Sequence, residues 1–79
     1  MKIQILGRGC AKCNNLTASV EETAQELGLV YELEKVTEIN DITAFGVMST
    51  PALVIDGEVK TVGKIPTAEE LKNILLDAQ

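Results

Sequence analysis

Two cysteines separated by two residues, Cys10 and Cys13, are the side chains best suited to chemistry, and they are the only cysteines in this chain of 79 residues. A disulfide that closes so short a loop removes little entropy from the unfolded chain, so it would be a poor structural crosslink. At positions i and i+3 of a helix, two side chains share one face and lie close enough to form a bond without moving the fold. The spacing therefore favours redox or thiol chemistry over a structural role.

Metal capture is the main alternative for a Cys-x-x-Cys pair. A closed zinc site needs four nitrogen or sulfur ligands, whereas this chain has two cysteines and no histidine. We therefore expect no metal and no cofactor apart from the Cys10–Cys13 pair itself. Two chains that share one ion, or a soft ion such as Cu(I) held by two thiolates, stay open as alternatives.

The acidity of the two cysteines decides which of them attacks, because the thiolate is the nucleophile in disulfide exchange. Cys10 lies at or just before the first turn of a predicted helix, where unpaired N–H groups and the helix dipole favour negative charge. Arg8 and Lys12 add positive charge beside it. Cys13 lies one turn further on, in line with Leu16 on the apolar stripe of the helix. We expect an exposed attacking Cys10, with a pKa below about 8.5, and a buried resolving Cys13.

The rest of the sequence predicts the elements that position this pair. A strand, a helix that ends at Gly28 and a second strand form a right-handed β-α-β unit with parallel strands. Asp56-Gly57 is a strong hairpin signal between two further strands, and Thr67 to Glu70 form a capping box before a last helix. The predicted elements are strand 2–6, a helix up to Leu27, strand 29–36, a short helix over 39–45 capped by Thr37, strand 52–55, strand 58–62 and a helix over 69–76.

This element order, β-α-β-α-β-β-α, predicts one α/β domain over residues 1–79 with a four-stranded mixed sheet and three helices. The predicted strand order is 2-1-3-4, and the last two strands form an antiparallel hairpin. A hydrophobic fraction of 46% is enough for a small core, and a net charge of −5 argues against nucleic acid as a partner. No apolar run approaches the ~18 residues of a membrane helix. The first strand leaves no room for a signal peptide, so we expect a cytoplasmic monomer whose thiols are kept reduced.

A second motif, Thr50-Pro51, precedes the apolar strand 52–55. Together with the dithiol and the element order, it makes the whole chain similar to the thioredoxin superfamily, and in particular to small prokaryotic thioredoxin-like redox-active disulfide proteins. The resemblance implies a thioredoxin-like fold, a cis bond before Pro51, and docking of a substrate backbone on Thr50 and Pro51. It also implies thiol–disulfide exchange, with Cys10 attacking a protein disulfide, Cys13 resolving, and an upstream thiol reductase as the second partner.

Three departures separate this chain from the better-known members of the superfamily. Gly9 stands in place of a tryptophan, and Ala11-Lys12 in place of Gly-Pro between the cysteines. Gln4 stands where many thioredoxins bury an acid, so we expect no group there that titrates together with Cys10. A carrier of Cu(I) or arsenite, and a regulatory binding module that kept the fold, stay as alternatives to an oxidoreductase.

Overall fold

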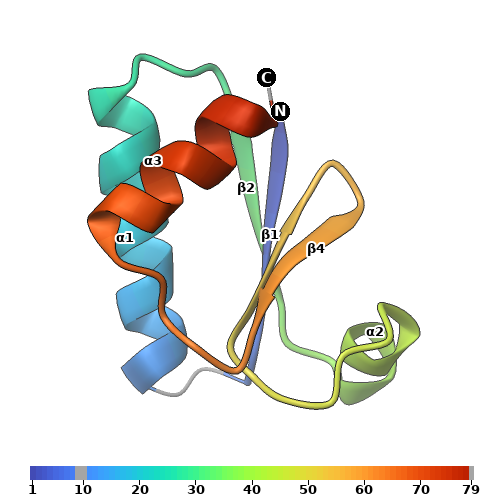
Figure 1. Cartoon of the computed structure of the whole chain (residues 1–79). Coiled ribbons are helices and arrows are strands. Elements are labelled where there is room, and N and C mark those ends of the chain that lie inside the picture. Colours follow the sequence, from blue (N-terminus) through green and yellow to red (C-terminus); the bar gives the residue numbers. More distant parts are fainter. Residues whose placement is uncertain (9–10, 79) are drawn as a thin grey trace.

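A four-stranded mixed sheet separates α1 and α3 on one face from α2 on the other in the computed structural model, which describes residues 1–8 and 11–78 (Figure 1). The strand order is β2-β1-β3-β4, with β1 and β2 parallel and the other two pairs antiparallel. This confirms the predicted topology. The elements are β1 (Lys2–Leu6), α1 (Ala11–Glu26), β2 (Glu32–Val36), α2 (Ile39–Ala44), β3 (Ala52–Ile55), β4 (Glu58–Val62) and α3 (Ala68–Asp77).

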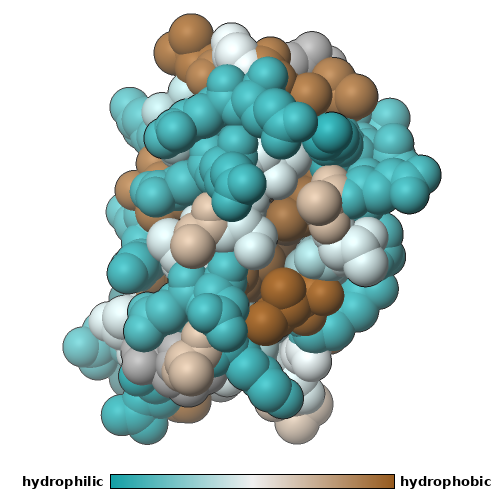
Figure 2. Space-filling view, turned by 90° about the vertical axis from the view of Figure 1, so that its left-hand side faces the viewer, coloured by the Kyte–Doolittle hydropathy of each residue, from teal (hydrophilic) through white to brown (hydrophobic). Residues whose placement is uncertain are grey.

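Side-chain alternation along the two central strands divides the core between the faces of the sheet. The larger cluster lies under α1 and α3, whereas the smaller one lies beside α2. Every residue of β3 is buried, as expected for a central strand that is covered on both faces. The opposite, outer side of α1 and α3 is mostly hydrophilic (Figure 2). The strand residues of the larger cluster are Ile3, Ile5, Leu53 and Ile55; those of the smaller are Leu6, Val36, Ala52 and Val54.

The predicted hairpin turn at Asp56-Gly57 is confirmed. Both residues have positive φ, 50° and 83°, as a two-residue type I′ turn requires. Asp56 Oδ1 also accepts a hydrogen bond of 2.8 Å from the backbone N–H of Lys2. This contact ties the hairpin to the start of β1.

Two predicted details near β2 are wrong. The strand begins at Glu32 rather than at residue 29, and Val30 is 91% exposed instead of being an apolar strand residue. The physical reason is the register: Glu32 pairs with Lys2, where β1 itself begins, so residues 29–31 have no strand residue beside them. Thr37 does not cap α2, because Glu38 is the N-cap and no side chain makes a cap hydrogen bond there.

Candidate functional site

The candidate site lies where β1 ends and α1 begins. β1 ends at Leu6, and α1 begins at Ala11. The predicted attacking residue, Cys10, and its neighbour Gly9 lie outside the described residues, so the placement of Cys10 stays a prediction. Arg8 and Lys12, predicted to favour the Cys10 thiolate, are both exposed.

Cys13 lies on the inner face of α1 and is only 4% exposed. Its backbone carbonyl accepts a hydrogen bond of 3.0 Å from Thr17 Oγ1, one turn further along the helix. Leu16 and Val20 continue the same buried stripe and belong to the larger core cluster. The predicted burial of Cys13 is therefore confirmed, and the core fixes the helix that carries it.

Gly7 packs directly against the side chain of Cys13. It is buried, and its N–H donates a hydrogen bond of 3.0 Å to the carbonyl of Val36. A Cβ added to Gly7 would overlap Cys13 Sγ and would lie 3.9 Å from Thr50 Cβ. Gly7 therefore brings Cys13 and Thr50 to one place. Gly7 was not among the site residues predicted from the sequence, although a glycine directly after a strand often marks a close backbone approach.

The Thr50–Pro51 peptide bond is cis, as the resemblance implied. Pro51 is fully buried, whereas Thr50 is exposed. The carbonyl of Pro51 accepts a hydrogen bond of 2.8 Å from the N–H of Gly63, in the loop between β4 and α3. The structure thus brings together three of the predicted site residues, Cys13, Thr50 and Pro51.

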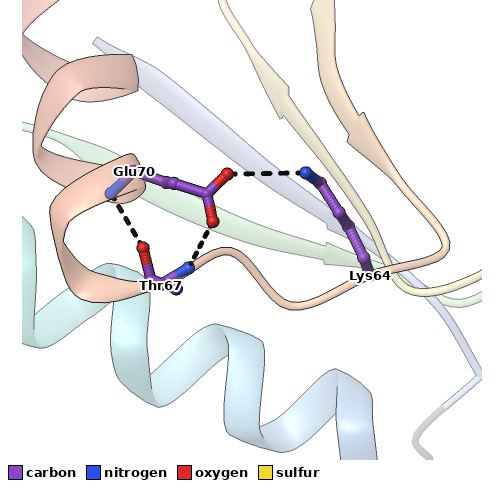
Figure 3. Close-up of polar contacts among 3 residues, drawn as sticks. All are labelled: Lys64, Thr67 and Glu70. Atoms are coloured by element: carbon purple, nitrogen blue, oxygen red, sulfur yellow. Dashed lines mark hydrogen bonds and ion pairs between the residues drawn. The ribbon is translucent and has the colours of Figure 1, made fainter.

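The loop that carries Gly63 is fixed by the first turn of α3 (Figure 3). Thr67 Oγ1 accepts from the N–H of Glu70 (3.2 Å), and Glu70 Oε1 accepts from the N–H of Thr67 (3.1 Å), which is the predicted capping box. Lys64 Nζ lies 3.5 Å from Glu70 Oε2. These contacts tie the loop to the first turn of α3, while Gly63 at its start bonds to Pro51.

The carboxyl of Glu70 makes this support sensitive to pH. Its pKa is lowered from 4.5, mainly by the hydrogen bond from the Thr67 backbone and next by the charge of Lys64. A carboxyl with a lowered pKa stabilises the fold above its unfolded-state pKa, and this contribution is lost as pH falls through the folded-state pKa. We expect Glu70→Gln to reduce the free energy of urea unfolding at about pH 7, with the difference shrinking toward about pH 3.

Glu69→Gln is the matched control. It removes a carboxylate from the same helical turn, but the Glu69 carboxylate takes no part in the capping box. The difference in the free energy of unfolding between Glu69→Gln and the wild type should change less between neutral and acid pH. A Glu70→Gln difference that is constant from neutral to acid pH would contradict the prediction.

Gln4 and Lys35 lie on different faces of the sheet. Gln4, which replaces the acid that the resemblance would put at this position, donates a hydrogen bond of 2.9 Å to Glu34 Oε1. Lys35 is the register partner of Ile5, and it lines a pocket of about 60 Å³ together with Cys13. Lys35 was not predicted from the sequence, because its place in the pocket that Cys13 also lines depends on the register of β1 and β2.

The described part of the chain contains no group of three or more His, Cys, Asp or Glu side chains that could hold a metal ion. None of its helices combines the length and the apolar character needed to cross a membrane.

Comparisons with known proteins agree with this fold. A family model described as a thioredoxin domain matches residues 1–76. The chain is 44% identical over 75 residues to a thioredoxin of Methanothermobacter thermautotrophicus, a match that covers 95% of this chain and 97% of that protein. It is 41% identical over 73 residues to a thioredoxin of Methanocaldococcus jannaschii, covering 92% and 84%. The chain therefore belongs to the thioredoxin superfamily.

Proposed function

We propose that this protein is a thiol–disulfide oxidoreductase that exchanges electrons with a protein partner through Cys10 and Cys13. The observation that carries the proposal is the position of Cys13, which is buried in the first turn of α1 against Gly7 and next to the Thr50–Pro51 loop. A cysteine in this position is sheltered from solvent, whereas the sequence places Cys10 directly before the helix. Membership of the thioredoxin superfamily supports the same class of activity.

The exchange takes place in two substitutions at sulfur. The Cys10 thiolate attacks one sulfur of the partner's disulfide, the partner's S–S bond breaks, and its other sulfur leaves as a thiolate. The Cys13 thiolate then attacks Cys10 Sγ, and the partner's second sulfur leaves. The partner has gained two electrons, and the chain holds a Cys10–Cys13 disulfide. An upstream thiol reductase returns the two electrons, which fits a reducing compartment such as the cytoplasm.

The surroundings of the pair offer a surface for the partner. Thr50 is exposed above the buried Pro51, and we assign to these two residues the docking of the partner's backbone. Met48, which is 97% exposed, and Ile65 lie in the two adjoining loops and offer apolar contact. Arg8 and Lys12 supply positive charge that favours the Cys10 thiolate.

A redox titration tests this function. We expect the protein to equilibrate with a glutathione or thioredoxin redox buffer in one reversible two-electron transition, with a midpoint roughly between −300 and −120 mV. Alkylation of the remaining thiols followed by mass measurement reports the oxidised fraction, and the Cys10→Ser/Cys13→Ser double variant is the control without a transition. Tight stoichiometric binding of Cu(I) or arsenite, with no turnover by a reductase, would instead support a carrier. Partner binding that survives the loss of both thiols would support a binding module.

A further inference from the structure

A small pocket opens beside Cys13 at the edge of the sheet. β1 and α1 form two of its walls, and Lys35 and Thr37 from the end of β2 form the third. β2 is an edge strand, so the Lys35 side chain reaches this pocket with no further strand beyond it. The volume of about 60 Å³ is enough for a water molecule. The remaining lining residues are Ile5, Gly7, Asn14 and Thr17.

Lys35 is the one charged side chain in the lining of this pocket, as far as the described residues go. On the same strand, Glu34 accepts a hydrogen bond from Gln4. The side chains that β1 and β3 contribute to the larger core cluster, under α1, are all apolar. On α1 itself, Lys12 does not line the pocket. A buried sulfur that must carry negative charge is costly to ionise unless a cation is close. Lys35 is itself exposed, but its side chain lines the pocket together with Cys13, so it is the cation placed to reach the sulfur.

None of the acidic groups of α3, which packs on α1, lines the pocket: Glu70 is held by Thr67 and Lys64, and Glu69 and Asp77 lie outside the lining. Glu26, at the far end of α1, pairs with Lys72. No carboxylate therefore competes with Cys13 for the Lys35 ammonium within the lining of the pocket.

We propose that Lys35 is a positioning residue for the second substitution: its ammonium stabilises the Cys13 thiolate, and the pocket is the route by which the Cys13 proton leaves. The inference rests on the proposed function. The proton of the Cys13 thiol passes to water, and the thiolate then forms the bond to Cys10 Sγ. The bond between Cys10 and the partner breaks, and the partner leaves as a thiolate.

Rapid mixing of the reduced protein with 5,5′-dithiobis(2-nitrobenzoate) separates the two substitutions. Attack by Cys10 releases the first coloured thionitrobenzoate, and attack by Cys13 releases the second. Each unit by which the Cys13 pKa rises lowers the thiolate fraction tenfold but raises its reactivity about threefold. We expect Lys35→Met to slow the second phase by about threefold to tenfold near pH 7 and to move its pH profile to higher pH, while the first phase is unchanged.

Two further variants test the cause. Lys35→Arg should restore the second phase, because it restores the charge. Lys2→Met removes the same charge at the far end of the sheet and should change neither phase. An unchanged second phase in Lys35→Met, an equal slowing of both phases, or a failure of Lys35→Arg to restore the rate would overturn the proposal. Release of only one thionitrobenzoate by the wild-type chain would instead overturn the proposed function itself.

Discussion

Cys13→Ser is expected to accumulate a stable mixed disulfide with a protein partner through Cys10, whereas Cys10→Ser is expected to accumulate little. The first substitution still occurs in Cys13→Ser, but no thiol remains to attack the bond between Cys10 and the partner. In Cys10→Ser, the remaining thiol is that of Cys13, which is 4% exposed and packed against Gly7. Non-reducing electrophoresis and mass measurement of the trapped species identify which cysteine carries the partner.

Alkylation of the two single-cysteine variants across pH provides the quantitative comparison. Near neutral pH we expect Cys10 to react faster than Cys13 by on the order of tenfold or more, because a low pKa and exposure both favour reaction. Unfolding in urea before alkylation is the control, since it should make the two rates similar. Faster modification of Cys13 in the folded protein would reverse the assignment. Equally slow rates for both thiols would weaken the oxidoreductase proposal as a whole.

Local signals were enough to predict most of the fold. The Asp56-Gly57 turn, the Thr67 capping box and the β-α-β start each depend on a few neighbouring residues, and the structure contains all three. The start of β2 was predicted wrongly because it depends on a partner strand. Residues 29–31 are apolar enough to form a strand, but β1 begins too late to pair with them.

The candidate site was predicted in the parts that lie within one element. The burial of Cys13 follows from the helical stripe that it shares with Leu16, and the cis bond at Pro51 follows from the resemblance. Gly7 and Lys35 were missed because each comes near Cys13 only through tertiary structure: Gly7 packs against its side chain, and Lys35 lines the same pocket. Neither a close approach between a loop and a helix nor the register of two strands can be read from local sequence.

Gly7→Ala is expected to destabilise the protein by about 1–3 kcal/mol, the usual cost of forcing an extra methyl group into a well-packed site. The new Cβ would overlap Cys13 Sγ, and Cys13 cannot withdraw easily because α1 is fixed by Leu16 and Val20 in the core. Gly7 does not have a positive φ, so alanine can adopt its backbone conformation. The loss of stability should therefore come from the contact between the new Cβ and Cys13 Sγ. Urea unfolding under reducing conditions measures the free energy.

A double-mutant cycle with Cys13→Ala assigns that cost to the sulfur. Removing Sγ leaves the Cys13 Cβ 3.2 Å from the new methyl group, a contact that a shift of a few tenths of an ångström relieves. Gly7→Ala should therefore cost less in the Cys13→Ala background, with an interaction energy of about 1 kcal/mol or more. Additive costs would show that the strain lies elsewhere, for example in the hydrogen bond from Gly7 to Val36. In the wild-type background, the same methyl group should slow the second thionitrobenzoate release more than the first, because it displaces the sulfur that performs the second substitution.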